Sequence, residues 1–129
     1  MLFRSYAATS NGTVYALDAV SGAALWPKPA QLDAPVQAPL AVDSRAVFVA
    51  ADPGTLVALA RQSGAVAWTF KQATQRDFLV SGQSGALVAD DLVVCGMPTG
   101  KLVALGARDG SLTWEVALDK PEQIGRAHV

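Results

Sequence analysis

Hydrophobic residues along this chain fall into short runs with a period of two, as in residues 13–17 and 65–68. That period is typical of β-strands, whereas the apolar positions of a helix recur every three to four residues. Dipeptides that accept a positive φ in a tight turn separate the runs: Ser21-Gly22, Ser63-Gly64 and Asp109-Gly110. The pattern therefore predicts hairpins of short strands and an all-β fold.

One unit occurs three times without a gap, at residues 12–26, 54–68 and 100–114. Each copy starts with a glycine, has a second glycine ten residues later and ends on a tryptophan four residues beyond that. The first glycines are 42 and 46 residues apart, and the tryptophans keep the same two intervals. A repeat of this period indicates an array of one supersecondary unit.

Two more strands are expected before each of the last two copies. Residues 38–42 with 46–50, and 85–89 with 92–96, have strand composition and are joined by turn residues, Asp43-Ser44 and Asp90-Asp91. Four strands about every 42 residues predict the blades of a β-propeller.

The expected blades cover residues 2–26, 37–70 and 83–118, and the first has only its last three strands. We therefore predict an open, partial β-propeller of about two and three-quarter four-stranded antiparallel blades. A closed propeller has about four to eight blades. Residues 1–120 form this fragment and 121–129 a tail. Residues 124–129 resemble the translation of a sequencing adapter, so we expect them to be non-native.

The repeat resembles that of the PQQ-like (quinoprotein-type) propeller family, whose motif has the form A-x-D-x-x-[TS]-G-x-x-x-W. The first copy matches it at Ala16, Asp18, Ser21, Gly22 and Trp26. The second copy has Ala60 at the aspartate position, and the third has Gly106 there with Asp109 at the Ser/Thr position. We expect the second and third turns to have lost some polar bonding.

In that family the tryptophan docks between neighbouring blades, where a large ring with one donor fills the wedge. The resemblance implies this structural role for Trp26, Trp68 and Trp114; the alternative is that the rings stack on a ligand. The residues expected to form the repeat turns are Gly12, Gly22, Gly54, Gly64, Gly100, Gly110 and Asp18.

Composition narrows the function classes. Hydrophobic residues make up 51% of the chain, enough for a domain with a core, but no run approaches the roughly 20 residues of a transmembrane helix. Ten basic and eleven acidic residues are scattered, which argues against a nucleic-acid partner. The single cysteine, Cys95, lies in an apolar run and is expected to be buried.

We assign no catalytic, cofactor-binding or metal-binding residue. Dehydrogenases with this repeat hold the quinone beneath a vicinal cysteine pair and bind Ca²⁺ with Glu, Asn and Asp, but Cys95 and Asn11 are the only residues of their types here. A Ser-His-Asp set would need His128, the only histidine, which lies in the suspect tail. The pair Asp90-Asp91 is interpreted as a solvated turn.

Within the family the chain is most similar to BamB-type lipoproteins of outer-membrane β-barrel assembly. In those proteins an apolar loop followed by Arg-Gly contacts the barrel partner, and the matching positions here are Phe78, Leu79 and Val80, followed by Ser81 in place of the arginine. Alternatively, residues 78–80 only lead into the outer strand of a blade.

The resemblance implies a non-enzymatic scaffold that binds a protein, is periplasmic or associated with the outer membrane, and belongs to a parent that could be lipid-anchored. No cofactor is expected. Two alternatives stay open: part of a PQQ-dependent quinoprotein dehydrogenase, and the sensor domain of a membrane kinase.

Overall fold

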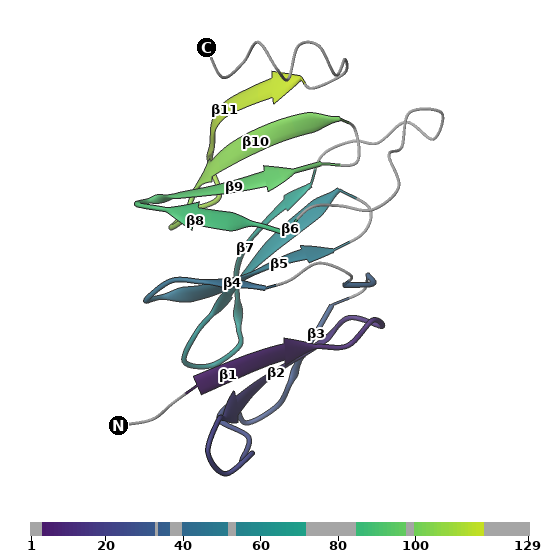
Figure 1. Ribbon diagram of the computed structural model, residues 1–129, viewed down its shortest axis with the longest axis vertical. Helices are drawn as coiled ribbons and strands as arrows, with labels where there is room; N and C mark the ends of the chain where they lie inside the picture. The colour runs from purple at the N-terminus through teal and green to yellow at the C-terminus, as the bar shows by residue number, and fades with distance from the viewer. Residues whose placement is uncertain are drawn as a thin grey trace.

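The computed structural model describes residues 4–32, 34–36, 40–51, 54–71, 85–97 and 100–117. Within these ranges the chain forms three antiparallel sheets, which follow one another along the long axis of the molecule (Figure 1). Sheet 1 consists of β1 (Arg4–Ala8), β2 (Thr13–Asp18) and β3 (Ala30–Gln31). Sheet 2 consists of β4 (Ala41–Val42), β5 (Ala46–Ala51), β6 (Thr55–Ala60) and β7 (Val66–Lys71). Sheet 3 consists of β8 (Leu87–Ala89), β9 (Leu92–Gly96), β10 (Lys101–Gly106) and β11 (Leu112–Ala117).

Strands that are consecutive in the chain are also hydrogen-bonded neighbours in each sheet. This arrangement needs only short connections, which the predicted turns supply. Three, four and four strands correspond to the two and three-quarter blades expected from the repeat. The last hairpin of sheet 2 and the last hairpin of sheet 3 share an irregularity in pairing. The register of β7 shifts opposite Ala58–Leu59 of β6, and the register of β11 shifts at the equivalent step, opposite Ala104–Leu105 of β10.

The outer strand of sheet 1 differs from those of the other two sheets. It pairs with β2 through one isolated bridge between Leu17 and Ala24, and then again through β3. Pro27 and Pro29 lie between these two contacts. Proline has no N–H to donate to the ladder, so the strand is interrupted where β7 and β11 are continuous. Sheet 1 thus extends to residue 31 and does not end at Trp26.

The core lies between the sheets, and sheet 2 contributes to it on both faces. Side chains of β5 alternate, so that Val47 and Val49 pack toward sheet 1 while Phe48 packs toward sheet 3. All six residues of β5 are buried, which explains its continuous apolar sequence. Cys95 is 1% exposed in the cluster between sheets 2 and 3, as expected.

We predict a large difference between two leucine truncations. Leu56 in β6 is fully buried, whereas Leu87 in β8 is 66% exposed. Leu56→Ala should lower the free energy of unfolding by about 2–5 kcal/mol, because it leaves a cavity in a packed core. Leu87→Ala should change it by less than about 0.5 kcal/mol. Urea unfolding of the two variants measures this difference, and equal losses would contradict the core described here.

Candidate functional site

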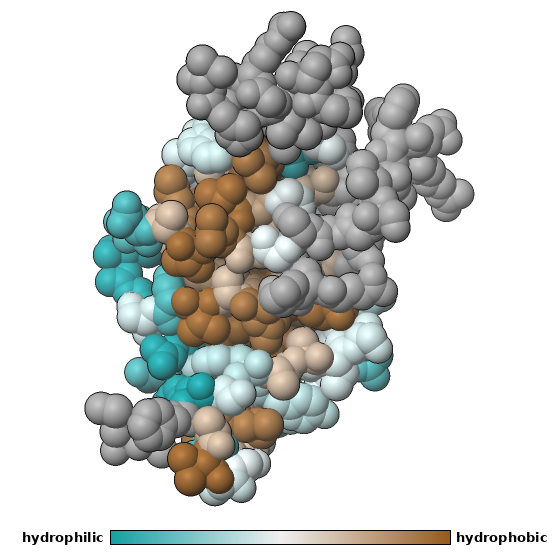
Figure 2. All heavy atoms as spheres, viewed as in Figure 1, coloured by the Kyte–Doolittle hydropathy of each residue, from teal (hydrophilic) through white to brown (hydrophobic). Residues whose placement is uncertain are grey.

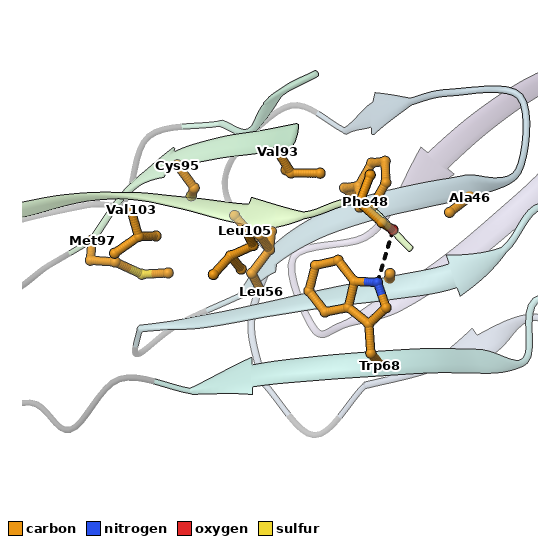
Figure 3. Close-up of a cluster of buried hydrophobic side chains, with 12 residues drawn as sticks. Ala46, Phe48, Leu56, Trp68, Val93, Cys95, Met97, Val103 and Leu105 are labelled. Carbon is orange, nitrogen blue, oxygen red and sulfur yellow. Dashed lines mark hydrogen bonds between the residues drawn. The ribbon is translucent and has the colours of Figure 1, made fainter. Parts of the chain in front are cut away.

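Tryptophans of sheets 1 and 2 contact the hairpin turn of the following sheet. The Trp26 indole Nε1 donates a hydrogen bond to the backbone oxygen of Arg61, at 2.8 Å. The Trp68 Nε1 donates to the backbone oxygen of Ala107, at 3.0 Å, along the dashed line in Figure 3. Arg61 and Ala107 are the same position of the repeat, directly after β6 and β10. Both rings are buried, so each indole is desolvated and hydrogen-bonded at once.

The same turns present a glycine to each ring. A Cβ on Gly64 would lie 2.7 Å from the ring of Trp26, and a Cβ on Gly110 would lie 2.6 Å from that of Trp68. The matching glycine of the first turn, Gly22, would have nothing within 4 Å of such a Cβ. In the second and third turns the residue must therefore supply a positive φ and also leave room for an indole.

Trp114, the third tryptophan, is in a different environment. Its side chain is 39% exposed, and Leu112 and Val116 of the same strand are 49% and 44% exposed. No turn follows β11 within the part of the chain that the structure describes. Its expected docking role therefore stays a prediction, while Trp26 and Trp68 each lie against a neighbouring turn.

Polar bonding in the first two turns differs as the sequences suggest. The Asp18 carboxylate accepts a hydrogen bond from the backbone N–H of Val20, at 2.9 Å. Ala60 has no side-chain acceptor at this position. Both turns keep a hydrogen bond to a serine hydroxyl. The Ser21 hydroxyl oxygen accepts from the backbone N–H of Ala23, and that of Ser63 accepts from the N–H of Ala65, at 3.2 Å in each turn.

The third turn regains a carboxylate acceptor from another position. Asp109 Oδ1 accepts from the Ser111 N–H at 3.0 Å and from the Ser111 hydroxyl at 2.8 Å. A Cβ on Gly106 would lie 2.8 Å from that oxygen, so the glycine provides its space. The hydrogen bond from the Ser111 backbone, followed by that from its hydroxyl, lowers the pKa of Asp109 below its ordinary value.

Two aromatic contacts within the sheets were not foreseen from the sequence. Tyr6 packs on Trp26 and Phe48 packs on Trp68, in both pairs with ring centroids 5.9 Å apart. Tyr6 and Phe48 are 42 residues apart, the same interval as the first two repeat glycines, and this interval was the available signal. Sheets 1 and 2 therefore each present an aromatic pair to the turn of the next sheet.

Several predicted positions can now be placed. All six repeat glycines have a positive φ, between +67° and +98°. Phe78, Leu79 and Val80 lie outside the described residues, as do His128 and the tail at 121–129. Among the residues described, no group of three or more His, Cys, Asp or Glu side chains could hold a metal ion. These residues also contain no helix long and apolar enough to cross a membrane.

Successive antiparallel sheets joined by tryptophan-to-turn contacts define part of a β-propeller built from quinoprotein-type repeats. Residues 4–128 match the family model described as outer membrane protein assembly factor BamB. The chain belongs to this family.

Two curated relatives carry the same description. The assembly factor BamB of Moranella endobia (strain PCIT) is 33% identical, with 90% of this chain and 31% of the relative covered. That of Kangiella koreensis is 35% identical, with 89% of this chain and 27% of the relative covered. The chain thus spans about a third or less of the length of these relatives.

Solved structures confirm the predicted fold class. The crystal structure of BamB from Moraxella catarrhalis has a TM-score of 0.81 at 29% identity, covering 88% of this chain and 34% of that one. A quinohemoprotein alcohol dehydrogenase from Pseudomonas putida HK5 has a TM-score of 0.74 at 22% identity, covering 89% and 19%. The dehydrogenase shows that the fold is shared, and nothing more.

A pair of glycine variants separates the tryptophan contact from the cost of backbone strain. Gly22→Ala and Gly110→Ala both place a Cβ at a positive φ, which costs about 1–2 kcal/mol. Only Gly110→Ala also forces that Cβ into the Trp68 ring, and such overpacking adds about 1–3 kcal/mol. We expect urea unfolding to show the larger loss for Gly110→Ala, together with a shift in tryptophan emission. Equal losses would mean that Trp68 does not lie on this turn.

The Asp109 turn predicts a pH dependence. The folded pKa lies below the ordinary 3.8, so the folded state favours the carboxylate. Its stabilisation is present above about pH 4 and is lost as the pH falls through the folded pKa. Asp109→Asn removes this titration. The urea midpoint of the parent chain should therefore fall more steeply below about pH 4 than that of the variant. Parallel acid limbs would contradict the prediction.

Proposed function

We propose that this chain is a non-enzymatic, protein-binding part of an outer-membrane protein assembly factor. The observation that carries the proposal is the match of residues 4–128 to the BamB family model. Two curated relatives at 33% and 35% identity have the same description, which supports this assignment over a dehydrogenase that shares the fold at 22%.

The organisation of the described residues supports a scaffold. Apolar side chains fill the space between the sheets, and the charged residues Asp43, Arg45, Asp90, Asp91 and Arg108 line an opening at the turns. Loops and turns held by packed sheets are suited to presenting a fixed surface to another protein. The relatives' description also supports a location in the periplasm or at the outer membrane. A lipid-anchored parent belongs to the proposal on the resemblance to BamB-type lipoproteins alone.

We place the partner contact at Phe78, Leu79 and Val80, following the resemblance to the apolar contact loop of BamB-type proteins. Aromatic and aliphatic anchors contribute most of the affinity at such interfaces. Ser81 cannot supply the bidentate hydrogen bonds of the arginine usual there, so the contact relies on its apolar side chains.

Trp114 has a separate, structural role in the proposal. We assign it to docking on the turn of a following repeat, in the manner of Trp26 and Trp68. Leu112 and Val116, exposed on the same strand, would be covered by that repeat. The receiving turn would need a glycine that leaves room for the ring, as Gly64 and Gly110 do. It would also need a backbone carbonyl, three residues before that glycine, to accept from the indole, as in residues 61–64 and 107–110.

The test is binding of this chain to the purified periplasmic region of an outer-membrane β-barrel assembly protein, measured by biolayer interferometry. Phe78→Ala combined with Val80→Ala should weaken binding at least about tenfold, because truncated anchors at an interface centre each cost over about 1 kcal/mol. The matched control is Val66→Ala combined with Leu87→Ala, which truncates two exposed apolar residues elsewhere. The control should bind like the parent chain.

Two results would overturn parts of the proposal. A folded parent chain that does not bind the barrel protein contradicts the assembly function. Equal weakening of the 78–80 variant and the control places the contact elsewhere on the chain.

A further inference from the structure

The two interfaces between sheets have the same backbone arrangement but different side chains. Between sheets 1 and 2, Arg61 Nε donates to the hydroxyl of Tyr6 at 3.0 Å. Arg4 Nη1 donates to the backbone oxygen of Arg61 at 3.2 Å, beside the bond from Trp26. Two guanidinium groups and a phenol hydroxyl therefore lie at the end of this interface that is next to the β6–β7 turn.

At the equivalent positions between sheets 2 and 3 these polar groups are missing. Ala46 stands at the position of Arg4, and Phe48 stands at that of Tyr6. Ala107 stands at the position of Arg61. The hydrogen bond from Trp68 to the Ala107 carbonyl is retained, so the two sheets stay in contact here. The substitutions shorten three side chains at one place while the backbone contact stays the same.

Two further positions at this place are also small. Ala60 stands where the first repeat has Asp18, and Ala67 stands where it has Leu25. The structure has a cavity of about 350 Å³ here, with Ala46, Ala60, Ala67 and Ala107 in its lining. The cavity thus occupies the space that longer side chains fill at the other interface.

Charged residues surround these four alanines. The cavity is also lined by Asp43, Arg45, Asp90, Asp91 and Arg108, three carboxylates against two guanidinium groups. An adjoining recess, which shares Asp91 and Arg108, adds Asp109. Figure 2 shows hydrophilic residues along the left edge of the molecule, the side on which Figure 1 places the β4–β5 and β8–β9 turns.

Hydrogen-bond acceptors in the cavity are held in place. Asp43 Oδ1 accepts from the N–H groups of Arg45 and Ala46, both at 2.8 Å, which fixes that carboxylate. The Ala107 carbonyl accepts from Trp68, and a carbonyl oxygen has a second lone pair. At the other interface the equivalent carbonyl uses both lone pairs, one of them for an arginine.

We infer that the cavity between sheets 2 and 3 binds the guanidinium group of an arginine side chain from a partner protein. The planar group would enter over the alanines and donate to the Ala107 carbonyl, as Arg4 donates to the equivalent carbonyl of Arg61 at the first interface. The surrounding carboxylates would supply further acceptors. That the arginine belongs to a protein rests on the proposed function. The preference for a guanidinium group does not, since it rests on the two interfaces alone.

The first test uses Nα-acetyl-arginine amide as the probe, titrated into the ¹⁵N-labelled full chain and followed by NMR. The backbone signals of Ala46, Asp91 and Ala107 should shift together and saturate. Nα-acetyl-citrulline amide has nearly the same shape without the charge, and it should bind at least about tenfold more weakly, because hydrogen bonds from an ionised donor are roughly twice as strong. Equal binding of the two, or tighter binding of Nα-acetyl-glutamate amide, would overturn the inference.

The second test fills the cavity from within. Ala107→Arg restores the residue present at the equivalent Arg61 position and should abolish the probe-induced shifts. Val20→Arg adds the same charge on a side chain that is 81% exposed and outside the cavity lining, and it should bind the probe like the parent chain. Should Ala107→Arg fail to fold, Asp91→Asn serves instead and should weaken binding severalfold by removing one carboxylate. Unchanged binding in the variant used places the probe elsewhere.

The outcomes separate this inference from the proposed function. Specific binding of the arginine probe without binding of the barrel protein supports the pocket and contradicts the assembly role. Binding of the barrel protein that Ala107→Arg leaves unchanged supports the assembly role and removes the pocket from the interface.

Discussion

The hydrogen bond from a tryptophan indole to the turn of the next sheet is the contact on which this structure depends. A short antiparallel sheet cannot cover its own apolar faces, and it needs a neighbour on each side. The indoles of Trp26 and Trp68 fill the space between two twisted sheets and satisfy a buried donor at the same time. Ring and acceptor both come from the repeat, so each interface repeats the geometry of the one before it.

This dependence on neighbours explains where the chain is buried. Sheet 2 has a partner on both faces, and its strands β5 and β6 are buried almost throughout. Each outer sheet has only one partner in the described chain, and Tyr15 of sheet 1 and Trp114 of sheet 3 are 38% and 39% exposed. Stability in such an array is close to a sum over adjacent pairs. The repeat tryptophan is therefore buried in sheet 2, as Trp68, and partly exposed in sheet 3, as Trp114.

The sequence was sufficient for the fold because the repeat specifies strands, turns and tryptophans together. It also contained the reason for the broken outer strand, since Pro27 and Pro29 remove two donors, but that strand was expected to end at Trp26. The bond from Arg61 to Tyr6 could not be predicted, because it joins side chains 55 residues apart across an interface. The third turn was expected to have lost polar bonding, because it has Asp109 at the Ser/Thr position and Gly106 at the aspartate position. The structure shows that the Asp109 carboxylate uses the space left by the missing Cβ of Gly106 and accepts hydrogen bonds there.

Differences between copies of a repeat separate what the fold requires from what it permits. Trp68, the Ala107 carbonyl and Gly110 reproduce the contact of the first interface, so the arginines there are not needed to hold two sheets together. Removing a charged group from water costs free energy that apolar packing does not, so partly buried arginines are weak evidence for stability at an interface. The side chains at positions 46 and 107 are therefore not required to bridge the two sheets, although both alanines are buried in the core. They line a cavity that also contains ionisable side chains, and the Asp43 carboxylate there is already held by backbone hydrogen bonds. An acceptor fixed in advance loses less conformational entropy when a ligand binds, which favours recognition at this place.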